Sequence, residues 1–140
     1  MTTVAEAFYG GPMRILALAA SLFAVAAPSK TIAVALVHTV SGCHVWQTTH
    51  SLGAHAAVTL PAGGKIVLRV NCPMDFTLTQ LKGPKLALGD PTLHTGTTRT
   101  LRFVKRGTYV LQAVNVQSSA EMGLQTLGPD NVPLLTVKVV

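Results

Sequence analysis

Short runs of alternating apolar and polar residues, separated by turn residues, dominate the chain after residue 30. Between positions 65 and 70, Ile66, Leu68 and Val70 occupy every second position, which is the period of a strand with one buried face. The same kind of run covers 31–40, 56–60, 75–83, 98–107, 107–116 and 132–140. No long segment of this region sustains a helical period. About seven strands, with turns at intervals of about 8 to 12 residues, predict an all-β sandwich.

The N-terminal region has a different pattern. A basic residue precedes the apolar run "ILALAASLFAVAA", in which Ala24 and Ala26 form the small-residue pair of a signal-peptide cleavage site. The run is short for a membrane span. We interpret residues 1–12 as an upstream extension, 13–27 as a signal peptide or N-terminal anchor, and 28–140 as one domain. These segments predict export to the periplasm or secretion, into an environment where cysteines pair.

Composition narrows the range of functions. The chain has 140 residues, of which 49% are hydrophobic and 11% charged, so it is long and apolar enough for one folded domain. The net charge is +6, but the cations are scattered and aromatic residues do not interleave with them, so no nucleic-acid interface is predicted. A basic surface instead fits an acidic partner. No paired carboxylates, phosphate loop or Ser/His/Asp motif is present, so we do not expect an enzyme.

Residues with metal-binding side chains gather in the stretch 41–55, "SGCHVWQTTHSLGAH". It contains Cys43, His44, His50 and His55, together with the only tryptophan. The spacing matches no strict metal motif. The stretch is therefore open to three interpretations: a metal site, one half of a disulfide, or a polar loop. We interpret His50 and His55 as surface histidines.

Three segments of the domain resemble small secreted bacterial cupredoxins. They are "VTLPAGGKIVLRVN" (58–71), "FVKRGTYVLQA" (103–113) and "TLGPDNVPLLTVKVV" (126–140). In that family a Gly-rich turn leads to a strand ending in Asn, a later G-x-Y strand precedes the ligand loop, and a β-rich strand ends the chain. The resemblance implies a Greek-key β-sandwich of the cupredoxin type and a role in handling copper.

The copper ligands of that family are not reproduced at their usual positions. A type 1 site requires two imidazoles, a thiolate and a weak axial thioether. In "NCPMDFTL", Asp75 or Phe76 occupies the position of the first histidine. In the ligand loop, Ala113 stands in place of the cysteine, and Met122 is the remaining ligand type. The resemblance therefore implies a degenerate ligand set rather than an ordinary blue-copper site.

By the same resemblance, the first strand runs parallel beside the third, so that Cys43 comes next to Cys72 at the pole where cupredoxins bind copper. Two interpretations remain open. One is a disulfide between Cys43 and Cys72, which neighbouring strand ends would allow. The other is a soft metal site, because thiolate, imidazole and thioether suit Cu(I). Its ligands would be His44, Met74, Met122, Cys43 and Cys72.

Three further side chains are placed by this scheme. Trp46 follows His44 by two positions and so shares its face, where it would shield a copper ion or act as a core tryptophan. His94 lies in the loop "GDPTLHTG" and is a second-tier metal ligand. We interpret His38 as an ordinary strand residue.

The sequence thus predicts an exported cupredoxin-like protein that binds or carries copper, with one-electron transfer as an associated role. Its partner would be a redox or envelope protein with an acidic surface. The alternative is a module without metal or other cofactor, held by the disulfide, that binds or assembles with another protein. Contact with a membrane is expected only through an uncleaved N-terminal segment.

Overall fold

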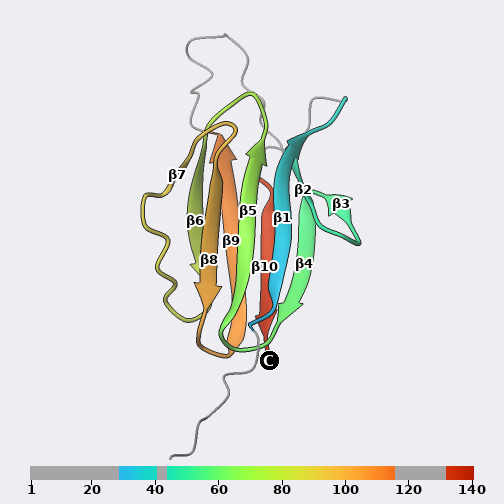
Figure 1. Cartoon of the computed structure of the whole chain (residues 1–140). Coiled ribbons are helices and arrows are strands. Elements are labelled where there is room, and N and C mark those ends of the chain that lie inside the picture. Colours follow the sequence, from blue (N-terminus) through green and yellow to red (C-terminus); the bar gives the residue numbers. More distant parts are fainter. Residues whose placement is uncertain (1–28, 41–43, 116–131) are drawn as a thin grey trace, which may run out of the picture.

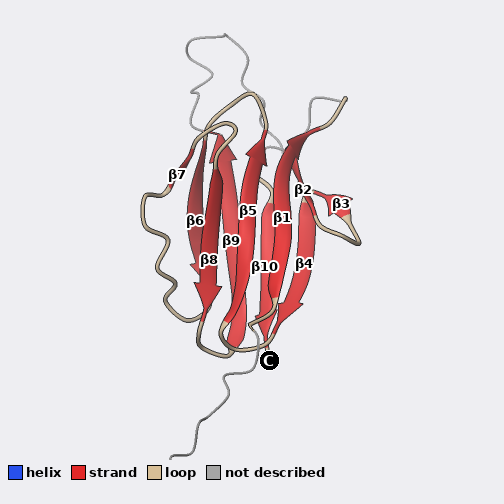
Figure 2. Ribbon diagram, in the orientation of Figure 1, coloured by secondary structure: helices blue, strands red, loops and turns tan. Residues whose placement is uncertain are grey.

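Ten strands form two five-stranded sheets that pack face to face in the part of the chain that the structure describes (Figures 1 and 2). The structure is a computed structural model and describes residues 29–40, 44–115 and 132–140. The predicted boundaries after residues 12 and 27 lie outside these ranges. In the described residues, no helix has the length and hydropathy needed to cross a membrane. The predicted all-β sandwich is confirmed.

The first sheet has the strand order β3-β2-β1-β5-β8. Its strands are β1 (Thr31–His38), β2 (His44–Gln47), β3 (Leu52–Gly53), β5 (Gly64–Asn71) and β8 (Thr98–Phe103). The central pair β1 and β5 is parallel, with Thr31 beside Lys65 and Val37 beside Asn71. This confirms the parallel neighbours that the cupredoxin resemblance implied, and it brings the ends of both strands to the same pole.

The second sheet has the order β4-β10-β9-β6-β7. Its strands are β4 (His55–Leu60), β6 (Phe76–Lys82), β7 (Thr92–Leu93), β9 (Gly107–Asn115) and β10 (Leu134–Val139). Strand β10 is parallel to β4 and antiparallel to β9, and β6 has an irregularity between Gln80 and Lys82. Both sheets are therefore mixed, so the chain crosses repeatedly from one layer to the other.

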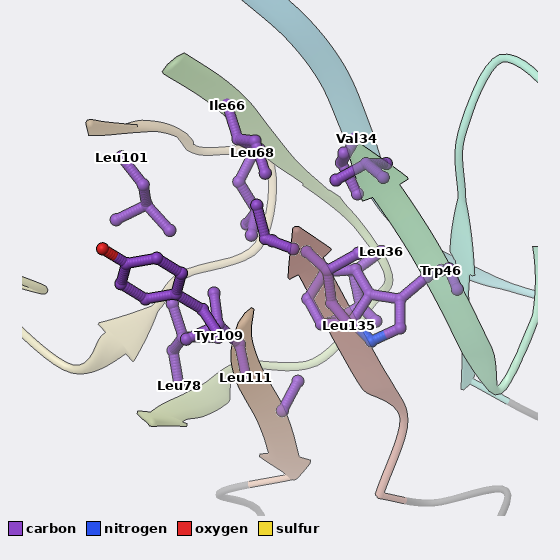
Figure 3. Packing of buried hydrophobic residues seen from close by; sticks show 14 of the residues in the cluster. Val34, Leu36, Trp46, Ile66, Leu68, Leu78, Leu101, Tyr109, Leu111 and Leu135 are labelled. Carbon is purple, nitrogen blue, oxygen red and sulfur yellow. The ribbon is translucent and has the colours of Figure 1, made fainter. Parts of the chain in front are cut away.

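The hydrophobic core lies between the two sheets and is built from every second residue of the long strands (Figure 3). Ile66, Leu68 and Val70 are at most 1% exposed, as their alternation predicted. The ring of Tyr109 packs edge-on against Phe103, with centroids 5.0 Å apart. Because aromatic and branched side chains fill this layer, the sandwich is stabilised mainly by apolar burial.

Two close contacts fix the end of the sandwich where β9 begins. The Tyr109 hydroxyl donates a hydrogen bond to the Lys105 carbonyl at 2.6 Å and ties the turn before β9 to the strand. Gly83, after β6, has φ +105°, and a Cβ at this position would lie 2.6 Å from the Thr108 carbonyl oxygen. Glycine is therefore required here both by conformation and by space.

The short strands β2, β3 and β7 were not predicted, because two to four residues are too few to show a period. The first strand was expected to continue to Val40 but ends at His38. Val40 is fully exposed. The chain then returns as β2, antiparallel to β1, and this hairpin forms the candidate site.

Candidate metal-binding pole

One end of the sandwich, at the top of Figure 1, collects most of the residues that the sequence singled out. Strands β1, β5 and β9 end there, and β2 and β6 begin there. We call this end the pole and define it by the described residues His38, His44, Cys72, Met74, Asp75, Phe76, His94 and Asn115. Cys43 and Met122, which were also predicted as ligands, lie outside the described residues.

His38 and His44 face each other across the β1–β2 hairpin. They are direct partners in the antiparallel register, in which Leu36 also pairs with Trp46. Partners in a register point to the same side of a sheet, so both histidines lie on the inner face with Leu36 and Trp46. The Nδ1 atom of His38 lies 3.3 Å from the Nε2 atom of His44, and the ring planes are inclined by 55°.

The two rings differ in burial. His44 is 3% exposed, and its ring stands edge-on to Phe76 with centroids 5.1 Å apart. His38 is exposed. The pair therefore reaches from the apolar interior to the surface. The cupredoxin resemblance implied that Asp75 or Phe76 stands where that family has its first histidine, and His44 contacts Phe76.

The separation of the two nitrogens has two chemical interpretations. It fits a hydrogen bond between neutral imidazoles, with one ring as donor and the other as acceptor. It also fits shared binding of one ion, because two imidazole nitrogens at about 2.0 Å from a tetrahedral ion lie about 3.3 Å apart. The hairpin thus holds two imidazole nitrogens near the spacing that two ligands of one metal ion would have.

Cys72 does not fit the role of a thiolate ligand. It is 2% exposed and donates a hydrogen bond through its Sγ to the Leu36 carbonyl at 3.3 Å. Burial raises the pKa of the thiol from 9.0 to about 11, so it stays protonated at neutral pH. Cys72 is a free cysteine in the structure. Since Cys43 lies outside the described residues, the disulfide between the two stays a prediction.

Met74 lies at the same pole, half-buried against the core. Its Sδ atom accepts a hydrogen bond from Nδ2 of Asn115 at 2.8 Å. This contact ties the segment before β6 to the last residue of β9. The thioether therefore has a polar partner of its own, and its role as a metal ligand stays a prediction.

His94 joins a different cluster, beside the start of β6. Its Nδ1 atom is 3.0 Å from Oδ2 of Asp75, and Oδ1 of Asp75 accepts a hydrogen bond from the backbone N–H of Thr95. The Thr95 and His94 hydrogen bonds lower the pKa of Asp75. Within the described ranges, no group of three His, Cys, Asp or Glu side chains is close enough to hold a metal. His94 is thus brought to Asp75 and not to the His38–His44 pair.

Trp46 is fully buried and belongs to the core cluster. Its Nε1 atom has no hydrogen-bond partner among the described residues. The tryptophan lies on the same face as His44, as expected, and packs between the sheets (Figure 3). His50 and His55 are exposed, in agreement with their interpretation as surface histidines.

The sequence analysis missed His38 as a site residue. Two histidines six positions apart are not a metal motif, and the strand was expected to run past His38 to Val40. The sequence did carry a signal in the segment "VHTVSGCHV" (37–45). In it, Val37-His38 and His44-Val45 flank a short intervening segment. If this segment is interpreted as a hairpin, His38 and His44 become direct partners.

Comparison with known proteins adds little to this topology. No family model and no curated protein matches the chain. Among solved structures, it is similar to a purple cupredoxin from Nitrosopumilus maritimus, with 15% sequence identity and a TM-score of 0.42. The match covers 76% of this chain and 98% of the other. By its own strand order and register, the described part of the chain is an all-β sandwich of two mixed sheets.

Proposed function

We propose that this protein binds copper at the pole, with Nδ1 of His38 and Nε2 of His44 as two of the ligands. The observation that carries the proposal is the 3.3 Å separation of these two nitrogens on directly paired residues of antiparallel strands. Imidazole nitrogen is a good ligand for copper in both common oxidation states. The cupredoxin-like fold is consistent with this role at a general level.

The residues present fit an imidazole site better than a thiolate site. Cys72 is held as a protonated thiol by burial and by the Leu36 carbonyl, so recruiting it would require the loss of that contact. Met74, the predicted thioether ligand, lies at the same pole. The predicted ligands Cys43 and Met122 lie outside the described residues. A bound copper ion would supply one-electron chemistry, and carriage of the ion needs no more than its binding and release.

The signal-like segment 13–27 favours a function outside the cytoplasm. In that compartment we propose that the protein carries copper to, or exchanges electrons with, a redox or envelope partner. His38 is the exposed member of the pair, so the ion would be reached from the solvent side through His38.

The test is a titration in which the protein competes for Cu(I) with a chelator of known affinity. The variants are His38→Ala and His44→Gln, and the matched controls are His50→Ala and His55→Ala, which remove exposed histidines away from the pair. We expect each test variant to weaken copper binding at least about tenfold. Removing a residue that only hydrogen-bonds a metal ligand already costs about that much affinity, and removing a ligand should cost more. Equal affinities in all five proteins would overturn the proposal.

A further inference from the structure

Half of strand β1 has a neighbour on one side only. Strand β2 pairs with Ala35–His38, whereas β5 pairs with the whole length from Thr31 to Val37. β2 stops early because the chain turns away at Thr48, whose hydroxyl accepts hydrogen bonds from the backbone N–H groups of His50 and Ser51. In the described part of the chain, no strand continues β2 along the first four residues of β1.

The backbone groups at this open edge can be assigned from the strand pairing. The Lys30 carbonyl accepts a hydrogen bond from the Lys65 N–H, so Lys30 and the residues at even positions of β1 face β5. Alternate residues of a strand direct their N–H and C=O groups to opposite sides. Thr31 and Ala33 therefore point their backbone donors and acceptors away from β5, into the space that β2 leaves open.

Two hollows flank this edge, one on each face of the sheet, and both include Ala33, Thr48 and Thr49 in their lining. The first, of about 450 Å³, lies on the outer face and also includes Ala35 and Arg69. The second, of about 510 Å³, lies between β1 and β4 and also includes Lys30 and Ala57. Figure 1 shows β4 passing beside this half of β1. An added strand would direct its side chains alternately into these two hollows.

The charge around the edge is positive on both faces. Arg69 lines the outer hollow and Lys30 the inner one. On the outer face, Lys65 and Arg102 are also direct cross-strand partners, an arrangement of like charges that is unfavourable without an anion nearby. In the described ranges, the carboxylate of Asp75 is engaged by His94 and Thr95, and that of Asp90 by the Thr92 N–H. Neither of these aspartates lines the two hollows, whereas Arg69 and Lys30 do.

The other outer edge of this sheet differs. The side chain of Arg99, on β8, donates hydrogen bonds to the carbonyls of Leu88, Asp90 and Thr92 and so ties the loop before β8 against that strand. The open half of β1 has no comparable cover among the described residues. Small side chains at Ala33 and Ala35 also leave room for an incoming segment.

We propose that the edge formed by Thr31 and Ala33 accepts an extended, acidic segment of a partner protein as an added strand, in the mode of β-augmentation. The backbone of Thr31 and Ala33 would supply up to about four hydrogen bonds, and Arg69 and Lys30 would each select a carboxylate, on opposite faces of the added strand. This site lies at the end of β1 opposite to His38, so it is independent of the proposed copper site.

The test uses the full chain and a synthetic capped peptide in which pairs of glutamates alternate with pairs of valines, so that each face of the added strand carries glutamate. We expect the peptide to bind, with the largest amide shifts in NMR at Thr31 and Ala33 and slower hydrogen exchange there. The control peptides carry lysine in place of glutamate, or N-methyl groups on alternate amides, and neither should bind. Ala33→Pro removes an N–H that no described strand uses and should weaken binding at least tenfold, whereas Thr100→Pro, on the outer edge of β8, should not.

A charge-reversal pair guards against loss of folding in the proline variants. Lys30→Glu with Arg69→Glu should abolish peptide binding, whereas the matched control, Lys82→Glu with Lys85→Glu, should leave it unchanged. The proposal is overturned if the glutamate–valine peptide does not bind, or if both reversals weaken it equally. Binding lost only with Thr100→Pro would move the site to the edge at β8. Binding of anionic vesicles but not of the peptide would indicate a lipid surface. Both results contradict the proposal.

Discussion

The Nδ1 atom of His38 lies 3.3 Å from the Nε2 atom of His44, across the hairpin that joins β1 to β2. His44 is packed against Phe76, and the strand register places the exposed His38 directly opposite to it. Because the register aligns the two rings, the proposed site would need less ordering to bind an ion. The function proposed for the pole rests on this hairpin.

Copper bound at the pair should be visible to the single tryptophan. Trp46 is two residues from His44 on the same face of β2, a distance of about 7 Å along the strand. We expect Cu(II) to quench the fluorescence of Trp46 at one equivalent, and we expect His38→Ala to remove this quenching at low copper concentrations. The measurement is a fluorescence titration with His50→Ala as control, and quenching that survives in His38→Ala but not in the control would count against the pair.

The buried thiol of Cys72 should affect stability only at high pH. Burial raises its pKa from 9.0 to about 11, so above pH 9 the unfolded chain loses the thiol proton before the folded chain does. The contribution of the protonated thiol to the free energy of unfolding is therefore fully present below pH 9. It is lost as pH rises toward 11, and this loss amounts to up to about 3 kcal/mol. Urea unfolding of the reduced protein between pH 8 and 11 measures this. Cys72→Ser should lose less stability over the same range, and parallel curves would contradict the assignment.

The hydroxyl of Tyr109 should stabilise the turn at the opposite end of the sandwich. Tyr109→Phe removes the hydrogen bond to the Lys105 carbonyl and keeps the edge-on contact with Phe103. We expect the free energy of unfolding to fall by about 1 kcal/mol, since the partly buried hydrogen bond to the Lys105 carbonyl is lost. Copper affinity should not change, because this turn lies at the start of β9 and the pole lies at the other end of that strand. Denaturant unfolding and the copper titration check the two parts separately.

Gly83 should tolerate no side chain. In Gly83→Ala the new Cβ would lie 2.6 Å from the Thr108 carbonyl oxygen and 2.9 Å from the Cα of Tyr109, at a φ of +105°. We expect a loss of about 3 kcal/mol or more, because backbone atoms must move. Gly89→Ala is the matched control, since its φ is also positive but no atom lies within 4 Å. Equal losses in the two variants would show that conformation alone, and not the close approach, decides the cost.

The fold could be predicted from sequence because its long strands carry their own period. Ile66, Leu68 and Val70 alternate in the sequence and are buried together in the core. The parallel placement of β1 beside β5 followed from the cupredoxin resemblance and not from the period, which says nothing about neighbours. Strands as short as β3 and β7 have no readable period and were missed.

The site was predicted only in part, for a physical reason. The sequence analysis placed His44, Met74 and Cys72 at the pole, and the structure has all three there. It assigned His38 to an ordinary strand position. Contact between His38 and His44 depends on the register of a hairpin, and a shift of one residue would put the rings on opposite faces. Cys72 was proposed both as a ligand and as half of a disulfide. Its burial and its contact with Leu36 could not be inferred from spacing.

The most direct test of the central claim is long-range ¹H–¹⁵N NMR of the five histidine rings during addition of Cu(I), which is diamagnetic and leaves the signals sharp. This spectrum identifies, for each imidazole, the nitrogen that gains a metal bond. We predict that one equivalent shifts Nδ1 of His38 and Nε2 of His44 together and leaves His50, His55 and His94 unchanged. A spectrum in which the rings of His38 and His44 do not change, or in which another histidine responds first, would contradict the account.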